Sequence, residues 1–182
     1  AAANILYGKI NPSGKLAETM PLKLSDNPSY LNFGGGEKVE YREGIFVGYR
    51  YYDTKEMDVA FPFGYGLSYT TFAYSNLKLS MENPTEKDTV MVSADVTNTG
   101  KSAGKEVVQL YIRDLTCSAI RPEKELKGFA KVFLQPGESR EVTIPLDDKA
   151  FRYFNVKTGK WETESGIYVL SVAAHSNDVK LV

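Results

Sequence analysis

Short segments in which apolar and polar residues alternate dominate the chain after about Thr71, and they constrain its fold more than any other feature. In an extended chain, Val90, Val92, Ala94 and Val96 fall on one face, because successive side chains point to opposite sides. The alternation therefore predicts a strand with one buried face. Segments of the same kind cover residues 72–80, 89–98, 107–113, 125–134, 140–146 and 167–173.

Turn-forming residues separate these segments. Asn98-Thr-Gly100, Gln135-Pro-Gly137 and Thr158-Gly159 combine the residue types that tight turns require. Six or seven strands in about 110 residues, without a helical period, predict an antiparallel β-sandwich of immunoglobulin-like size. We place the start of this unit between residues 70 and 76.

The first twenty residues predict a different kind of structure. Ala1 to Tyr7 has the pattern of the last turns of a helix, with Gly8 as its left-handed cap, so the chain is expected to begin inside a domain. Asn11-Pro-Ser-Gly14 carries a strong turn signal. Lys15 to Met20 predicts a short strand that ends at Pro21.

The segment from Leu24 to Lys38 is rich in Ser, Asn, Pro and Gly and predicts a loop, mobile around Gly34-Gly-Gly36. Gly44 to Tyr52 has apolar residues on both faces, which favours a buried strand or a short buried element. The prolines and glycines of Phe61 to Gly66 then predict an irregular, tightly turned connection.

Aromatic residues crowd into the region before the sandwich. Eleven of the twenty-two lie between Tyr41 and Tyr74. Aromatic faces among hydrogen-bonding side chains suit either a tight domain junction or a platform for sugar rings, and we favour the junction. Trp161 follows a turn in the second half, where it is either an exposed anchor or part of the sandwich core; we favour the core.

Overall composition excludes several classes of function. With 42% hydrophobic and 25% charged residues the chain is typical of globular proteins, and a net charge of −1 without a basic cluster does not indicate nucleic acid binding. No segment approaches the roughly 20 apolar residues of a membrane span. Ala1 to Tyr7 lacks the features of a signal peptide, and the compartment stays open.

Carboxylates in the aromatic region are the candidates for chemistry, because glycoside hydrolysis uses a pair of them about 5 to 10 Å apart. Glu43 is the best placed of the four. An ion pair with Arg42 or Arg50 would instead keep it ionised, and we favour that role over catalysis. The four candidates are Glu37, Glu40, Glu43 and Asp53.

Other reactive residues offer little. Cys117 is the single cysteine and predicts a small, partly buried side chain rather than a catalytic thiol. His175 is the single histidine and is expected to face solvent at the end of a strand, so neither a metal site nor a histidine-dependent triad is indicated. Gly34-Gly-Gly36 lacks the residues of a phosphate-binding loop.

Longer motifs carry a resemblance that covers essentially the whole chain. The segments around Asn11 and Tyr41 and the string from Phe61 to Phe72 resemble the distal part of glycoside hydrolase family 3, in its β-glucosidase branch. The sandwich resembles that family's terminal fibronectin type III-like domain. Its matching strings are Val96-Thr-Asn-Thr-Gly100, Gly104-Lys-Glu-Val-Val-Gln-Leu-Tyr111, Pro122-Glu-Lys-Glu-Leu-Lys-Gly-Phe129 and Leu134-Gln-Pro-Gly-Glu138.

The resemblance implies residues 1–72 as the end of an α/β sandwich domain and residues 73–182 as a fibronectin type III-like β-sandwich. It also implies an enzyme that removes terminal β-D-glucosyl residues from short β-glucosides by a retaining mechanism, without metal or cofactor. The nucleophilic Asp and the acid/base Glu of the family belong to segments outside residues 1–182. No catalytic role is therefore transferred to Glu43, and the matched residues are expected to be framework.

The same resemblance implies a partner for the N-terminal segment: the barrel and the rest of the α/β sandwich, on the same or another chain. Without these domains, apolar side chains within residues 1–70 would be exposed and would favour association or aggregation of the chain. A non-catalytic carbohydrate-binding or adhesion module stays open as the alternative function. The residues expected in the exposed patch are Ile5, Leu6, Ile45, Phe46 and Val47.

Overall fold

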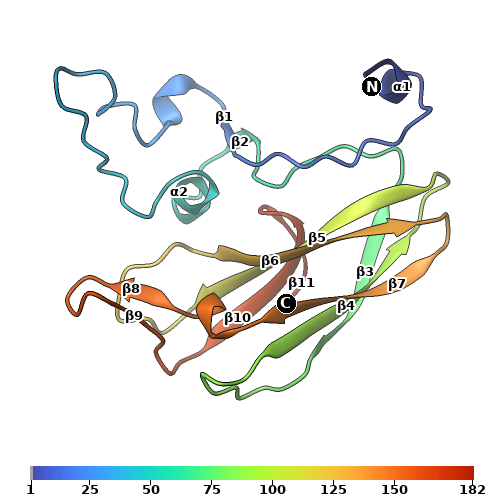
Figure 1. Cartoon of the computed structure of the whole chain (residues 1–182). Helices are drawn as coiled ribbons and strands as arrows, with labels where there is room; N and C mark the ends of the chain where they lie inside the picture. The colour runs from blue at the N-terminus through green and yellow to red at the C-terminus, as the bar shows by residue number, and fades with distance from the viewer. Residues whose placement is uncertain (1) are drawn as a thin grey trace.

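A long N-terminal segment lies across one side of a β-sandwich in the computed structural model, which describes residues 2–182 (Figure 1). The N-terminal segment contains α1 (Ala2–Leu6), β1 (Met20–Pro21), the 3-10 helix η1 (Leu24–Asp26), α2 (Tyr49–Thr54) and β2 (Val59–Phe61). The sandwich contains β3 (Phe72–Leu79), β4 (Val90–Asn98), β5 (Gly104–Asp114), β6 (Glu125–Leu134), β7 (Ser139–Leu146), the 3-10 helix η2 (Asp148–Ala150), β8 (Tyr153–Asn155), β9 (Lys160–Glu162), β10 (Tyr168–His175) and β11 (Asp178–Leu181).

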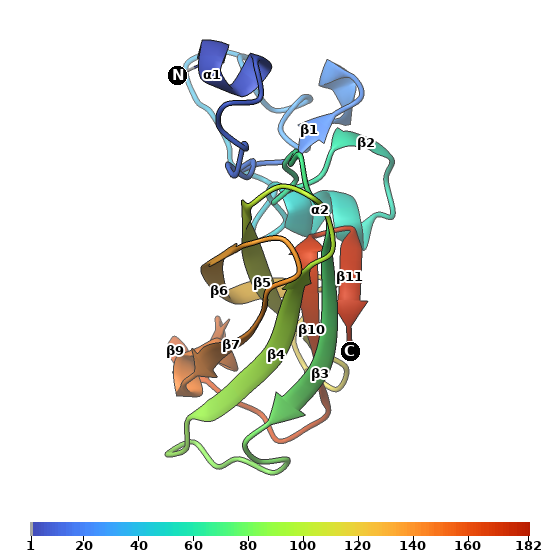
Figure 2. The same ribbon diagram turned by 90° about the vertical axis from the view of Figure 1, so that its right-hand side faces the viewer.

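Two antiparallel sheets form the sandwich. One has the strand order β11-β10-β5-β6 and the other the order β3-β4-β7, and Figure 2 shows the N-terminal segment at one end of them. β8 and β9 form a separate two-stranded hairpin, and β1 pairs with β2. The fold is therefore mainly β, with antiparallel sheets, as the alternating segments predict.

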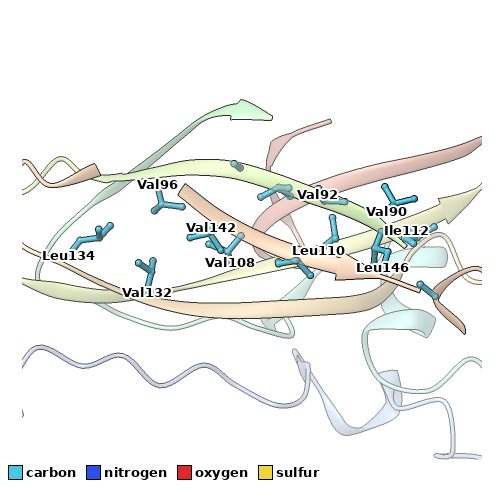
Figure 3. Packing of buried hydrophobic residues seen from close by; sticks show 14 residues of the cluster. Val90, Val92, Val96, Val108, Leu110, Ile112, Val132, Leu134, Val142 and Leu146 are labelled. Atoms are coloured by element: carbon cyan, nitrogen blue, oxygen red, sulfur yellow. The ribbon is translucent and has the colours of Figure 1, made fainter. Parts of the chain in front are cut away.

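The core lies between the sheets and consists of the apolar residues that the alternation singled out. Val90, Val92, Ala94 and Val96 of β4 are all at most 3% exposed. Figure 3 shows the three valines facing apolar side chains of β5, β6 and β7. The facing residues labelled there are Val108, Leu110, Ile112, Val132, Leu134, Val142 and Leu146.

The six predicted strands are confirmed as β3, β4, β5, β6, β7 and β10. Gln135-Pro-Gly137 and Thr158-Gly159 form turns with Gly137 at φ +77° and Gly159 at φ +68°, a backbone region that favours glycine. Four strands were not predicted: β2, β8, β9 and β11. Each spans at most four residues, too few for an alternation to be recognised.

Asn11-Pro-Ser-Gly14 is not a turn, and this prediction is wrong. The chain is extended here and runs beside residues 64–65, where the Leu16 amide donates to the Tyr65 carbonyl at 2.8 Å. Asn11 uses its side chain for tertiary hydrogen bonds instead of closing a turn. The helix end before it is confirmed for the described residues: α1 ends at Leu6 and Gly8 has φ +68°, while Ala1 lies outside them.

Residues 44–52 do not form a buried strand. The chain enters α2 at Tyr49 through Gly48, and Ile45 and Val47 before it are each 46% exposed. Tyr52 is the buried residue of α2, so the alternative of a short buried element holds for the helix alone. Of the strand expected before Pro21, only Met20–Pro21 forms, and the 24–38 loop contains only η1 and turns.

None of the helices within residues 2–182 is long and apolar enough to cross a membrane.

Candidate functional site

The aromatic region packs onto the outer face of β5. In β5, Leu110 faces the core, whereas Gln109 and Tyr111 point to the opposite face. They are nevertheless only 3% and 0% exposed. The Tyr49 ring lies 5.9 Å from the Tyr111 ring and stacks on Phe63 at 4.7 Å. This face of the sheet is therefore a second, aromatic core shared by the two parts of the chain.

Hydrogen bonds of Gln109 fix the geometry of this joint. Its carboxamide nitrogen donates to the carbonyls of Gly64 at 3.3 Å and Ala174 at 2.9 Å, while its oxygen accepts from the Tyr111 hydroxyl at 2.6 Å. A Cβ on Gly64, which has φ +80°, would lie 2.3 Å from that oxygen. The glycine is required by both its backbone conformation and this close approach.

Helix α2 is held on the sandwich by polar contacts to the start of β6. The Leu126 amide donates to the Tyr49 hydroxyl at 2.7 Å, and the Glu123 amide donates to the Thr54 hydroxyl at 3.0 Å. The Lys124 ammonium lies 3.1 Å from the Asp53 carboxylate. Arg50 also lies 4.0 Å from Glu125, so this short helix contacts all four residues from 123 to 126 through hydrogen bonds or ion pairs.

Burial shifts the ionisation of the groups in this joint. Burial raises the pKa of Asp53, and the Lys124 ammonium opposes the rise. Burial also acts to raise the pKa of Glu125, but the hydrogen bond from Arg121 and the positive charges around it outweigh burial and lower the pKa. Perturbed carboxylates occur both in active sites and in structural ion pairs, and the partners here are those of ion pairs.

The structure does not assemble the four candidate carboxylates into one site. Asp53 is buried against Lys124, whereas Glu40 is exposed and accepts a 2.7 Å hydrogen bond from Arg42. Glu37 is exposed and Glu43 is half-buried. Within residues 2–182 Glu43 forms no ion pair, so the expected pairing with Arg42 or Arg50 is wrong. Arg42 pairs with Glu40, and Arg50 lies 4.0 Å from Glu125.

A second joint surrounds Asn11 and the end of β4. The Asn11 carboxamide oxygen accepts from the Tyr69 amide at 2.9 Å, and its nitrogen donates to the Ala103 carbonyl at 3.0 Å. Asn98, which is fully buried, accepts from the Thr70 hydroxyl and donates to the Leu134 carbonyl at 3.1 Å. These two asparagines connect the N-terminal segment with the β4–β5 loop and the end of β6.

Glu106 adds a buried charge to this second joint. It is 5% exposed and accepts from the Lys15 ammonium at 3.2 Å and the Tyr74 hydroxyl at 3.0 Å. Burial, together with the charge of Glu106, raises the pKa of Tyr74 well above its usual value. The phenol therefore remains a hydrogen-bond donor at all physiological pH values.

Sequence reasoning did not single out Gln109, Asn98 or Glu106, although a signal was present. Asn98 and Glu106 are buried polar residues within strands, and Gln109 lies on the face of β5 opposite the core. A polar residue at a buried position must find a hydrogen-bond partner, so each marks a place where another segment covers the sandwich.

The remaining aromatic residues of this region divide between packing and exposure. Tyr52 is 3% exposed, whereas Tyr41 is 89%, Tyr69 50% and Phe61 47% exposed. The favoured packing role is therefore borne out for Tyr49, Tyr52 and Phe63 but not for the whole set.

Exposed apolar side chains also extend through the N-terminal segment, as expected: Leu6, Ile45 and Val47 are at least 46% exposed, while Ile5 and Phe46 are half-buried.

Trp161 is not part of the core. It lies on β9 with 65% of its surface exposed, so the favoured interpretation is wrong and the exposed one holds. Its hairpin pairs with neither sheet of the sandwich. The Trp161 ring packs against Phe154, with ring centroids 5.6 Å apart.

The single cysteine and the single histidine lie in unreactive settings. Cys117 is partly buried, as expected, and burial raises the pKa of its thiol. His175 is half-buried rather than solvent-facing, because its ring packs on Tyr65 at 5.6 Å, and burial lowers its pKa. Among residues 2–182, no group of three or more His, Cys, Asp or Glu side chains could hold a metal ion.

The described contacts define a structural joint: an aromatic layer, two buried ion pairs, the buried Asn98 and the half-buried Asn11 bind an irregular segment to a fibronectin-like sandwich. Comparison with protein families agrees with this division. Residues 1–69 match the "Glycosyl hydrolase family 3 C-terminal domain", and residues 106–176 match the "Fibronectin type III-like domain". The chain is the C-terminal part of a family 3 glycoside hydrolase.

Relatives match over the whole chain. It is 54% identical to "Thermostable beta-glucosidase B" of Acetivibrio thermocellus and 52% identical to "Beta-glucosidase" of Kluyveromyces marxianus. These matches cover 100% and 98% of the chain but 24% and 21% of the relatives, so the chain spans about a quarter of their length. A third relative, 47% identical over 98% of the chain and 23% of its own length, is "Exo-alpha-(1->6)-L-arabinopyranosidase" of Bifidobacterium breve.

The fold also matches solved structures. The family 3 β-glucosidase of Bifidobacterium adolescentis superimposes with a TM-score of 0.92 at 45% identity, covering 98% of this chain and 26% of that one. The glucose complex of the Kluyveromyces marxianus β-glucosidase gives a TM-score of 0.91 at 50% identity, covering 98% and 21%.

Proposed function

We propose that the protein to which this chain belongs is a retaining β-glucosidase that hydrolyses terminal non-reducing β-D-glucosyl residues of short β-glucosides. The observation that carries the proposal is the 54% identity to a β-glucosidase across all 182 residues. In a retaining mechanism one carboxylate attacks the anomeric carbon and a second carboxyl group protonates the leaving oxygen. The two carboxyl groups lie about 5 to 5.5 Å apart. Neither residue is assigned to this chain.

Residues 1–182 act as framework in this proposal. Asp53, the most buried of the four candidate carboxylates, is held by Lys124, and Glu40 is held by Arg42. Both carboxylates therefore have the partners of structural ion pairs, which supports a framework role. Residues 1–72 complete an α/β domain, residues 73–182 form the sandwich, and the joint between them holds that domain from behind.

Hydrolysis of p-nitrophenyl β-D-glucoside tests the proposal. The 182-residue chain should show no turnover, whereas the longer protein that contains it should hydrolyse the substrate. Turnover by the 182-residue chain, with mass spectrometry showing only this species, would place the chemistry among Glu37, Glu40, Glu43 and Asp53 and overturn the proposal. p-Nitrophenyl α-L-arabinopyranoside is the second substrate, because one relative is named for that activity.

Glu43 provides a sharper test within the longer enzyme. Since it is half-buried and has no ion pair within residues 2–182, Glu43→Gln should change stability by no more than about 0.5 kcal/mol and leave turnover unchanged. Turnover and thermal unfolding are measured on the same preparation. A large loss of turnover at unchanged melting temperature, restored by azide, would instead identify Glu43 as a catalytic carboxylate.

A further inference from the structure

The β8–β9 hairpin presents two exposed aromatic rings on one face. Phe154 and Trp161 are paired directly across the two strands, so their side chains lie on the same side. Tyr153, the neighbour of Phe154, points to the opposite side and is 9% exposed. In Figure 1 the hairpin projects from the left of the sandwich, below the N-terminal segment. The sandwich therefore carries an aromatic pair directed to solvent.

The two rings form a corner rather than a packed stack. Their centroids are 5.6 Å apart and their planes meet at 70°. Trp161 is 65% exposed and Phe154 is 49% exposed, so each ring keeps a free face. Aromatic faces of this kind pack on the C–H faces of sugar rings as well as on apolar protein surfaces.

Side chains on the inner face of the hairpin hold this corner rigid. The Glu162 carboxylate accepts hydrogen bonds from Asn155 at 2.8 Å and from Thr158 at 2.5 Å. These bonds lower the pKa of Glu162, which keeps it charged and bonded at neutral pH. A pre-formed corner loses little conformational entropy when a ligand binds, and this favours the binding of a rigid ligand ring.

A groove lies at one end of the sandwich, and the segment that follows the hairpin forms part of its wall. Thr163, two residues after Trp161, is part of its lining, and its volume is about 900 Å³. The opposite wall is the loop between β3 and β4, which meets the segment before β10 at this end of the sandwich (Figure 2). The volume is within the range of about 300 to 1,000 Å³ that small-molecule sites occupy.

The groove combines an apolar floor with hydrogen-bond acceptors. Leu77, Leu170 and the Phe151–Tyr168 ring pair form part of the floor. Among residues 2–182, no Lys or Arg lines the groove. Such a surface suits a neutral ligand that has apolar faces and many hydroxyl donors. The carboxylates of the lining are Glu82, Glu86, Asp88, Asp148 and Glu164.

We propose that the Phe154–Trp161 corner and the adjoining groove bind a β-linked gluco-oligosaccharide, with one pyranose ring against the corner and its neighbours along the groove. The sugar class rests on the proposed function, whereas the position of the site rests on the geometry above. Binding here would hold the substrate polymer or oligosaccharide on the enzyme without cleaving it.

The single tryptophan makes the test direct, because all tryptophan emission from the 182-residue chain comes from Trp161. Cellohexaose is titrated to about 10 mM, and emission is followed together with calorimetry. We expect a saturable change in emission and a matching heat of binding, with no glucose released. No saturable change would overturn the proposal. So would emission that depends on protein concentration without sugar, since a second copy would then cover the corner.

Matched variants locate the site. Trp161→Ala should weaken cellohexaose binding at least about ten-fold by calorimetry, while Phe129→Ala should leave it unchanged. Phe129 is a suitable control because it is 68% exposed on β6. Thr163→Val should weaken binding about three-fold, with Thr143→Val on the outer face of β7 as its control. Equal effects of variant and control, or unchanged binding by Trp161→Ala, would overturn the proposal.

The outcome is independent of the hydrolysis test. If the longer protein hydrolyses β-glucosides but the chain does not bind cellohexaose, this inference fails and the proposed function stands. If cellohexaose binds at Trp161 but no β-glucoside is hydrolysed, the proposed function fails and the chain is a carbohydrate-binding module.

Discussion

Asn98 at the end of β4 shows how much one side chain contributes to the joint. It is 0% exposed and accepts from the Thr70 hydroxyl and the Gly100 amide, while it donates to the carbonyls of Ser102 and Leu134. All of its hydrogen-bonding capacity is therefore used inside the protein. Removing it would leave several buried polar groups without partners.

Asn98→Ala should lower the free energy of unfolding by about 3 kcal/mol, because unsatisfied buried groups cost about 1 to 3 kcal/mol each and the loops can relax only in part. Chemical denaturation measures the loss. Asn83→Ala, at an exposed position in the β3–β4 loop, should change the free energy by less than about 0.5 kcal/mol. Similar losses for both variants would show that the Asn98 hydrogen bonds are not the cause.

Glu164 gives the sandwich a defined sensitivity to acid. Hydrogen bonds from Ser118 and Tyr153 hold its pKa at about 2, below the usual 4.5. A lowered pKa in the folded state stabilises the fold above the unfolded value, and this contribution disappears as pH falls from about 4.5 toward 2. Melting temperatures of the native chain should therefore fall more between pH 5 and pH 3 than those of Glu164→Gln. Equal falls would exclude Glu164 as the source.

At the scale of elements, α2 joins the two parts of the chain through a set of polar contacts. The amides of Glu123 and Leu126 donate to side chains of this helix, so their hydrogen exchange reports directly on whether the helix is docked. The buried pair of Asp53 and Lys124, with side chains 6% and 18% exposed, lies between these two hydrogen bonds.

Lys124→Ala should weaken the docking of α2 by about 3 kcal/mol, because it leaves the Asp53 carboxylate buried without its partner. Exchange of the Leu126 amide should then become roughly a hundred-fold faster. The double variant Asp53→Ala/Lys124→Ala should recover much of the loss, since no unpaired charge remains. If the Leu126 amide of Lys124→Ala exchanges as slowly as in the native chain, the Asp53–Lys124 pair does not hold the helix.

Strand positions could be predicted because the sandwich buries one face of each long strand, as in Val90 to Val96. The conformations of residues 11–14 and 44–52 could not be predicted, because they depend on contacts with residues far along the sequence. Asn11 adopts an extended conformation to reach Tyr69 and Ala103, and α2 forms where Tyr49 meets Tyr111. Local propensity is weak against such contacts. The carboxylates were found by residue type, but only the structure separates Asp53 from the exposed Glu37.

Trp161 was misplaced for a related reason. An aromatic residue after a turn in a β-rich sequence is most often buried, and the sequence around it does not show that β8 and β9 stand apart from both sheets. The prediction that the aromatic region forms a domain junction is correct for only some of its rings. Crowding of aromatic residues in the sequence indicates an interface but does not show which rings face it. Exposure therefore had to come from the structure.

At the scale of the whole molecule, the sandwich buries an apolar core between its two sheets, whereas the N-terminal segment leaves many of its apolar side chains exposed. Leu31 is 90% exposed and Phe33 is 78% exposed, and both lie in the segment that the family resemblance assigns to a larger domain. Exposed apolar surface of this extent favours association or binding to a partner. The remaining domains of the enzyme are the partner that we propose.

Leu31→Glu/Phe33→Glu should reduce self-association of the 182-residue chain, because it places charges in the exposed apolar segment. Sedimentation velocity and binding of a hydrophobic dye measure the effect, and both signals should fall at least about two-fold. Ile120→Glu, at an 82% exposed position on the sandwich, is the matched control and should have a smaller effect. A larger effect of the control would place the association surface on the sandwich.

The second core on the outer face of β5 has a consequence for how such enzymes diversify. Tyr49 and Phe63 come from the segment before the sandwich, whereas Gln109 and Tyr111 come from the sandwich, and side chains of the two parts pack against each other. A sandwich taken from a distant relative would therefore bring half of an interface that its new host cannot complete. Recombination between such enzymes should succeed when the crossover lies before Tyr49 and fail when it lies between Phe63 and Gln109, so we expect the two parts to be exchanged only together.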